Sequence, residues 1–166
     1  MIELGKKDVL RALLTAVQEH CAAVERVAAM ARDEASSDET RSEGKYDTRA
    51  TEASFLARGQ AERVDDLRRA RSWLEQEVHA SLSGPKPAAS TQAEIGSLIE
   101  VQMRGRTELL FIAPMTTAPV RVSERTVRVV ALSSPLGTAL ANARSGDILE
   151  INGPQGTTEC EVIDVV

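Results

Sequence analysis

The chain has 166 residues, enough for one ordinary domain or two small ones. Its hydrophobic fraction of 42% lies in the globular range and excludes a disordered acidic tail, and its net charge of −5 gives no global argument for binding nucleic acid. The longest apolar runs are far too short to cross a bilayer, and the N-terminus lacks the apolar core and cleavage-site pattern of a secretory signal. We therefore expect a cytoplasmic protein with no membrane partner.

Glycine and proline divide the chain into two halves. All six prolines lie after residue 84, and between Gly5 and Gly84 only two glycines interrupt the chain. The first half can therefore be helical almost throughout, whereas turns break up the second half. We expect a helical hairpin over residues 1–82, a linker over 83–94 and a sheet domain over 95–166.

Two long runs in the first half have helical patterning. In residues 6–32 and again in residues 47–81, apolar residues recur at spacings of three, four and seven, which predicts narrow coiled-coil stripes. The stripe residues are Leu10, Leu13, Val17, Val24, Val27 and Ala31 in the first run, and Leu56, Val64, Leu67, Leu74 and Val78 in the second. Because neither run is apolar on all sides and their link is short, we expect an antiparallel hairpin about 45 Å long.

The segment that joins the two runs, residues 33–47, is acidic. Its six carboxylates face only two basic residues, Arg41 and Lys45. Small polar residues and a glycine near its end are typical of the tip of a helical hairpin. From the residues alone two interpretations stay open: the segment is a solvated acidic turn, or the two helices deliver functional carboxylates.

The cysteines and histidines do not form a metal-binding pattern. Cys21 and Cys160 lie far apart in different types of segment and resemble small buried thiols more than a disulfide or a metal site. His20 and His79 lie on opposite predicted helices and belong to no cluster of ligand residues. We therefore expect no zinc site.

After the linker the hydrophobic period becomes that of strands. Strands are predicted at about residues 97–103 (half-exposed), 108–112, 126–130, 147–151 and 157–165. Residues 134–141 predict a short helix, because Ser134 is a good N-cap and Pro135 fits the first helical position. Asn152–Gly156 indicates a hairpin turn. The second half is thus a small antiparallel sheet with one crossing helix, and the whole chain is of the α+β class.

A helical hairpin with a charged tip, followed by a small sheet domain, resembles the Gre transcript-cleavage factors of bacterial RNA polymerase. The strongest match lies in the C-terminal half. There, Ser134-Pro135-Leu136-Gly137-Thr138-Ala139-Leu140, Gly146-Asp147 and Gly153-Pro154-Gln155-Gly156 are similar to the family's Ser-Pro-Leu/Ile-Gly-x-Ala-Leu, Gly-Asp and Pro-Gly-Gly elements in order and spacing. Residues 111–115 also resemble a segment of Gre-like relatives.

The resemblance implies a fold for each half. In the Gre family the second domain has the fold of FKBP-type proline isomerases but lacks their activity. The expected architecture is then an antiparallel coiled-coil hairpin with its tip at about residues 33–47, followed by an FKBP-like domain over 95–166. An FKBP pocket is walled by aromatic rings, and Phe111 is the only aromatic residue of the sheet half. We therefore expect a docking module and no isomerase.

The tip differs from the family's motif. That motif is Asp-Leu-Ser-Glu-Asn-Ala-Glu-Tyr, in which the Asp and the first Glu are functional. Ser42-Glu43 matches its Ser-Glu, but three residues before Glu43 lies Thr40, where the family has Asp. Either the turn is rearranged so that Asp38 or Glu39 reaches the same place, or the chemistry is altered.

The resemblance also implies a mechanism. Gre factors insert the hairpin into the secondary channel of RNA polymerase, where the 3′ end of backtracked RNA is extruded, and stimulate cleavage of that RNA. Hydrolysis of a phosphodiester needs a second metal ion, and one or two carboxylates are enough to recruit Mg²⁺. Asp38, Glu39 and Glu43 are the candidates for this catalytic and metal-binding role, shared with the polymerase. The chain itself is then no enzyme, and the other tip carboxylates fit solvated helix-end charges.

Basic residues of the hairpin offer a second candidate site. Family members contact the extruded RNA through its phosphates, without reading bases. Arg58 and Arg63 are the candidates for RNA contact on this chain. The alternative for the arginines of the second run is pairing with acidic residues of the same helix, namely Glu62, Asp65, Asp66 and Glu75.

Three functional hypotheses follow. The first is a Gre-like factor that stimulates cleavage, with RNA polymerase and the backtracked RNA 3′ end as partners and with the chain as a monomer. The second is a Gre-like regulator that occupies the same channel without promoting cleavage and inhibits or competes. The third is a coiled-coil adaptor or chaperone unrelated to transcription, for which pairing of two hairpins would give a dimer.

Overall fold

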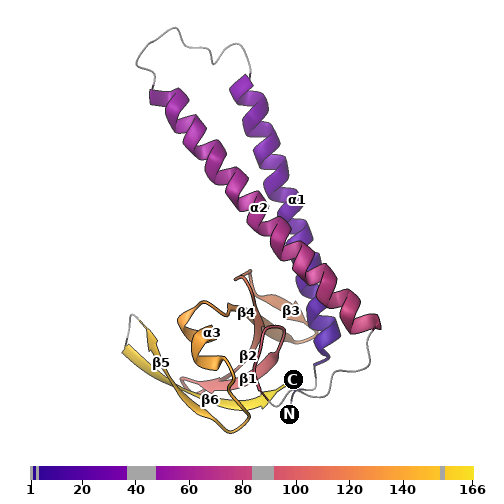
Figure 1. Ribbon diagram of the computed structural model, residues 1–166, viewed down its shortest axis with the longest axis vertical. Helices are drawn as coiled ribbons and strands as arrows, with labels where there is room; N and C mark the ends of the chain where they lie inside the picture. The colour runs from indigo at the N-terminus through magenta and orange to yellow at the C-terminus, as the bar shows by residue number, and fades with distance from the viewer. Residues whose placement is uncertain (1, 3, 37–47, 84–91, 154–155) are drawn as a thin grey trace. The chain divides into compact units, whose positions relative to one another are not determined.

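The computed structural model of the chain describes residues 2, 4–36, 48–83, 92–153 and 156–166 (Figure 1). Two compact units are present: Val17–Ser72 forms one, and Met1–Ala16 together with Trp73–Val166 forms the other. Two long helices, a six-stranded sheet and one short helix make up the described ranges, which confirms the predicted α+β architecture. Within these ranges, no helix combines the length and the apolar character needed to cross a bilayer.

The two long helices match the predicted runs closely. Helix α1 spans Lys6–Ser36 and helix α2 spans Thr48–Ser83. Helix α1 begins directly after Gly5, whose carbonyl oxygen accepts hydrogen bonds from the first free backbone N–H groups of the helix. Both runs are rich in strong helix formers, so local propensity and the apolar spacing agree on the same structure.

The apolar stripe of α1 differs in part from the predicted one. Val17 is buried as predicted, but the stripe continues through Cys21 and Ala28, whereas Val27 is 54% exposed. Leu10 and Leu13 are buried as well, and Val24 is half-buried. Spacings of four, three and four keep a stripe in line along an α-helix of 3.6 residues per turn, and Val27 falls beside this line. Ala28 therefore takes the place that the prediction gave to Val27, and Cys21 fills a position between Val17 and Val24 that the prediction left out.

The sheet contains six strands in the order β3-β4-β2-β1-β6-β5, and it is not closed. The strands are β1 (Leu98–Met103), β2 (Arg106–Ala113), β3 (Val120–Val122), β4 (Arg125–Ala131), β5 (Ile148–Gly153) and β6 (Gly156–Val165), and helix α3 (Pro135–Leu140) lies between β4 and β5 in the chain. The five strands predicted from the sequence are all present, and β3 is an additional short strand.

One strand pairing differs from the predicted antiparallel pattern. Four of the five pairings among the described strands are antiparallel, but β2 and β4 run parallel, with Leu110 opposite Arg128 and Ile112 opposite Val130. After β2 the chain forms β3 at the edge of the sheet, antiparallel to the strand that follows it. That strand, β4, lies between β3 and β2 and therefore runs in the same direction as β2. The sheet is therefore mixed.

The centre of the sheet is buried on both faces. Strand β1, which β2 and β6 flank, was expected to be half-exposed, but Leu98, Ile99 and Val101 are fully buried because both faces of the sheet are covered here. On one face, Ile99 belongs to a core that includes Leu140 of α3. On the other face, Phe111 of β2 meets Trp73 of α2, with ring centroids 6.3 Å apart and an interplanar angle of 54°.

The short helix α3 sits very close to the strand before it. Its N-cap is Ser134, whose Oγ accepts a hydrogen bond from the backbone N–H of Gly137 at 3.0 Å and donates one to the carbonyl oxygen of Ala131 at 2.7 Å. A Cβ atom at Gly137 would lie only 2.0 Å from that same carbonyl oxygen. Ser134 of the family-like motif is thus the cap that the sequence predicted, and Gly137 is a point of close backbone approach.

The two thiols are free and buried, as the sequence predicted. Burial raises the pKa of Cys160, and the nearby Glu108 carboxylate adds to this effect. Burial and the neighbouring Glu25 carboxylate raise the pKa of Cys21.

We expect both thiols to resist alkylation by iodoacetamide in the folded protein. Burial excludes the reagent, and a raised pKa keeps the sulfur in its unreactive protonated form. Labelling measured by mass spectrometry should accelerate by more than about tenfold once denaturant exposes both groups. The raised pKa values also imply that the protein loses stability as the pH rises above the ordinary thiol range, because unfolding then releases the two protons. Fast labelling of Cys160 in the native protein would contradict this expectation.

Candidate functional site

The acidic tip predicted from the sequence lies between the two long helices. Helix α1 ends at Ser36 and α2 begins at Thr48. Asp38, Glu39 and Glu43 therefore belong to the connecting segment, and they lie outside the described residues. What the described residues do show is how the two helices that lead to this segment are held together.

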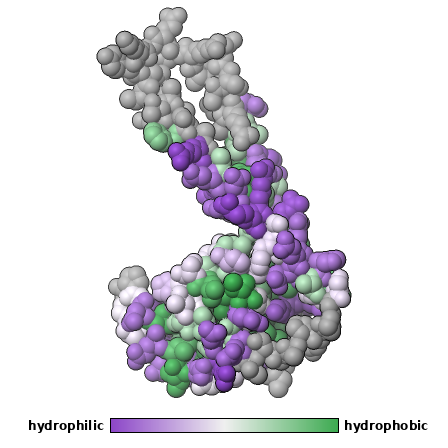
Figure 2. All heavy atoms as spheres, in the orientation of Figure 1, coloured by the Kyte–Doolittle hydropathy of each residue, from purple (hydrophilic) through white to green (hydrophobic). Residues whose placement is uncertain are grey.

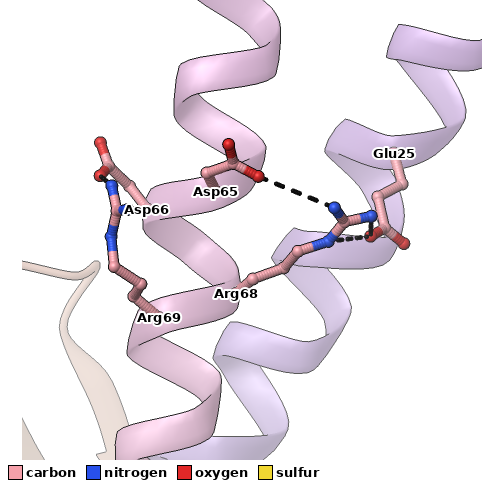
Figure 3. A network of polar contacts seen from close by, with 5 residues as sticks. All are labelled: Glu25, Asp65, Asp66, Arg68 and Arg69. Carbon is pink, nitrogen blue, oxygen red and sulfur yellow. Dashed lines mark hydrogen bonds and ion pairs between the residues drawn. The ribbon is translucent and has the colours of Figure 1, made fainter.

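A cross-helix ion pair joins α1 and α2 in the unit Val17–Ser72 (Figure 3). The guanidinium of Arg68 donates from Nε at 3.1 Å and from a terminal nitrogen at 2.9 Å to one carboxylate oxygen of Glu25. Arg68 also lies 3.7 Å from Asp65, one turn away on its own helix. These contacts show that Glu25 and Arg68 face each other across two antiparallel helices, as the hairpin prediction requires.

Buried apolar side chains fill the seam beside this ion pair. Cys21 and Ala28 of α1 and Val64 and Ala70 of α2 are each less than a tenth exposed. Figure 2 shows many hydrophilic side chains along the described part of the hairpin, although Met30 and Phe55 are also exposed. Such a narrow seam under a charged surface is typical of a two-helix coiled coil.

The seam, rather than the ion pair, should carry the stability of the hairpin. Both side chains of the Glu25–Arg68 pair are well exposed, at 43% and 60%, so solvent screens their attraction. A double-mutant cycle with Glu25→Gln and Arg68→Met should give a coupling energy below about 1 kcal/mol. Val64→Ala should cost about 2 kcal/mol by comparison. Denaturant unfolding followed by circular dichroism measures both, and a coupling above the cost of Val64→Ala would contradict the argument.

The arginines of α2 pair mainly with acidic residues of the same helix. Arg58 donates to Glu62 at 3.2 Å, and Arg69 lies 2.6 Å from Asp66. Arg58 and Arg69 thus pair within α2 as in the simpler alternative, whereas the shorter contacts of Arg68 are with Glu25 of α1. Arg63 is exposed, and within the described part of the chain its guanidinium forms no ion pair. RNA contact by Arg58 and Arg63 stays a prediction, and the weak exposed pair of Arg58 is compatible with exchange for a phosphate.

The sheet unit contains one polar pair that the sequence analysis did not anticipate. Glu100, in the middle of β1, is only 7% exposed and accepts a short hydrogen bond of 2.5 Å from Arg125 of β4. Glu100 lies on a face of β1 that the folded sheet unit covers, and the positive charge of Arg125 compensates its carboxylate there. Among the described residues, no group of three or more His, Cys, Asp and Glu side chains is placed to hold a metal ion.

The described chain therefore defines a class of architecture: an antiparallel helical hairpin joined in sequence to an open mixed sheet with one short helix. Solved structures that resemble it carry Gre-type names. GreA factor homolog 1 (Gfh1) of Thermus thermophilus matches with a TM-score of 0.36 and 18% identity, over 93% of this chain and 95% of that one. Gfh1 of Thermus aquaticus matches with a TM-score of 0.37 and 17% identity, over 93% and 94%.

A third solved structure, the elongation factor GreA/GreB from Nitrosomonas europaea, matches with a TM-score of 0.35 and 21% identity, over 64% of this chain and 91% of that one. No protein-family model and no curated protein matches the chain. Because all three TM-scores lie below 0.5, these superpositions carry no argument about function. The proposals below rest on the residues of this chain.

Proposed function

We propose that this chain is a Gre-like transcription elongation factor that binds RNA polymerase, inserts its hairpin into the secondary channel and stimulates cleavage of backtracked RNA. The observation that carries the proposal is the antiparallel pairing of α1 and α2, marked by the Glu25–Arg68 contact. This pairing brings the two ends of the acidic segment, Ser36 and Thr48, to the same end of the hairpin.

The proposed site is the trio Asp38, Glu39 and Glu43. Carboxylate oxygens are the hard ligands that Mg²⁺ prefers, so the donor set fits this metal ion. When bound, Mg²⁺ supplies the activation of the attacking water that phosphodiester hydrolysis needs. The role of the trio is to complete the ligand set that the polymerase provides. The role of the hairpin is to carry the trio on the segment that joins its two helices. The chain alone then has no hydrolytic activity.

The proposal is tested with stalled elongation complexes. Complexes carrying RNA labelled at the 3′ end are incubated with the protein and Mg²⁺, and released fragments are separated on a gel. We expect short 3′ fragments that depend on the protein, on Mg²⁺ and on backtracking. Failure to bind core RNA polymerase in a pull-down would favour the coiled-coil adaptor or chaperone, and light scattering would then test for its expected dimer.

A second function is favoured by the altered tip motif. Thr40 occupies the position where the Gre motif has its functional Asp. A hydroxyl group is a weaker Mg²⁺ ligand than a carboxylate, so the hairpin would occupy the channel without recruiting the metal. This non-cleaving regulator predicts that the protein reduces cleavage when a genuine Gre factor is present. Increased or unchanged cleavage in this competition assay would exclude it.

A further inference from the structure

Strand β5 forms one edge of the sheet. It is the last strand in the order β3-β4-β2-β1-β6-β5, and among the described strands it pairs only with β6. The strand Ile148–Gly153 has six residues, its one charged residue is Glu150, and a bulge at Gly146-Asp147, opposite Val162, precedes it. Free backbone groups of an edge attract another strand, and a charge or a bulge at the edge limits which strands can add.

The hydrogen-bond pattern shows which backbone groups face outward. The N–H of Val162 donates to the carbonyl oxygen of Asp147 at 2.8 Å, and the carbonyl oxygen of Val162 accepts from the N–H of Gly146 at 2.7 Å, so the ladder begins at this bulge with the carbonyl group of Asp147 facing β6. Hydrogen-bonded and non-hydrogen-bonded pairs alternate along such a ladder. The N–H and C=O groups of Ile148, Glu150 and Asn152 therefore point away from β6, toward the free edge.

The side chains of the same residues give this edge an acidic face. Ile148 lies opposite Glu161, and Glu150 lies opposite Glu159, in the register of β5 and β6. All four are exposed, and Ile148 is 65% exposed. Side chains of a non-hydrogen-bonded pair are the closest across a ladder, and like charges placed there repel each other.

The chain does not neutralise this face within the described residues. The ion pairs found there join other residues, and none includes Glu150, Glu159 or Glu161. Arg104, in the β1–β2 turn, lines the same shallow hollow as Glu159 and Glu161 but donates a hydrogen bond to Thr158 at 3.3 Å. A strand with a free edge thus has repelling charges beside it.

We propose that the free edge of β5 binds, by strand addition, an extended segment of another protein in which basic and apolar residues alternate. The proposal is independent of the proposed function at the hairpin tip. Strand addition satisfies the outward backbone groups of Ile148, Glu150 and Asn152. Because side chains alternate between the faces of a strand, one set of the partner's side chains lies beside Glu150, and this charge calls for lysine or arginine.

The other face of β5 explains why every second residue of the partner segment should be apolar. Leu149 and Ile151 are half-buried and pack against the core that contains Ile99 and Leu140. An added strand extends this layer on the side of α3, so the partner's remaining side chains should be valine, isoleucine or leucine. The edge therefore specifies both the backbone form of its partner and the alternation of its side chains.

The test uses the full chain and synthetic peptides of about eight residues, a length sufficient to span β5. Binding is measured by fluorescence anisotropy of a labelled peptide in which arginine and valine alternate. The matched control is a peptide of the same composition with the arginines and the valines in two separate blocks. We expect saturable binding of the alternating peptide, at least about tenfold tighter than that of the block peptide, because only the alternating one presents charge to a single face.

Variants separate charge from backbone pairing. Glu150→Gln with Glu159→Gln should weaken binding about three- to tenfold without lowering Tm, whereas Glu124→Gln, a charge change in the β3–β4 turn, should have no effect. Glu150→Pro removes an outward N–H and leaves the bonds to β6 intact, so it should bind at least about tenfold more weakly than Glu150→Gln.

The outcomes decide between the occupants of the edge. Equal binding of the two peptides would overturn the proposal, because charge alone would then explain the affinity. Absence of binding at millimolar peptide would also overturn it. A concentration-dependent dimer of the free protein, broken by Glu150→Pro in light scattering, would assign the edge to a second copy of the chain and would likewise overturn it.

Discussion

Replacing Asp38, Glu39 and Glu43 together by alanine should abolish the cleavage stimulation that we propose for the chain, while leaving its proposed affinity for RNA polymerase unchanged. The expected loss is at least about 100-fold in the cleavage rate, because a metal ion that activates water contributes several kcal/mol to hydrolysis and each 1.4 kcal/mol is tenfold in rate. Binding should persist because the helices and the sheet unit do not depend on these three side chains for their described contacts.

The control for this variant has the same change in charge at the ends of the same segment. Asp33, Glu34 and Asp47 are the carboxylates that we assign to solvated helix ends, and their joint replacement by alanine should change the cleavage rate less than about threefold. A rate loss that is equal in the two triple variants would show that general negative charge, and not a metal-binding set, is what the tip supplies.

Magnesium dependence gives an independent measurement on the tip. Removing one carboxylate at a time should raise the Mg²⁺ concentration needed for half-maximal cleavage, since fewer ligands hold the ion. A variant that lowers the maximal rate at saturating Mg²⁺, with no change in the concentration dependence, would instead indicate that its side chain positions the RNA.

Substituting Gly137 by alanine should be the most destabilising single-methyl change in the sheet unit. The added Cβ would lie 2.0 Å from the carbonyl oxygen of Ala131 and 2.9 Å from Cα of Leu132, and both contacts are with backbone atoms that cannot turn away. Either α3 must lift off the sheet or β4 must shift, and we expect a loss of about 3 kcal/mol or more in the free energy of unfolding. Thermal and denaturant unfolding measure it.

Gly59 is the matched control for this substitution. It lies within α2, it is exposed, and a Cβ atom placed there would meet no atom within 4 Å. Gly59→Ala should therefore stabilise the protein by about 0.5–1 kcal/mol, because alanine loses less backbone entropy in a helix. If Gly137→Ala were as stable as Gly59→Ala, the close approach of α3 to β4 would be wrong.

Local patterns were enough to predict most elements. The bounds of α1 and α2 follow from good helix formers and a repeating apolar stripe, and Ser134-Pro135 predicted the start of α3 correctly. These features depend only on residues a few positions apart. For this reason a single sequence carries them.

Features that depend on distant residues could not be predicted in the same way. The burial of Glu100 depends on Arg125, which belongs to a strand whose pairing partner the sequence does not specify. The parallel pairing of β2 with β4 depends on β3, whose three residues are too few to show alternation. In α1, Ala28 is buried in place of Val27 because the direction in which a residue points, and not the size of its side chain, decides which residues face the partner helix.

The sequence predicts which kinds of residue the candidate site contains, but not how they are arranged. Six carboxylates between two helical runs indicate an acidic tip, and the described helices place that segment between Ser36 and Thr48. Which carboxylates approach one cation depends on backbone angles within the turn, and spacing in the sequence does not determine them. The function of Asp38, Glu39 and Glu43 is therefore a matter for the cleavage assay.

The central position of β1 has a consequence for synthesis on the ribosome. Its partner β6 is encoded about 60 residues later, and Leu98 exchanges two backbone hydrogen bonds with Val166, at 2.8 and 2.9 Å. While the chain is still being made, β1, β2 and β4 can meet, but one edge of β1 stays open until Val166 has left the exit tunnel. The nascent hairpin, built from contacts closer in sequence, can form earlier, so the two units should mature in a fixed order.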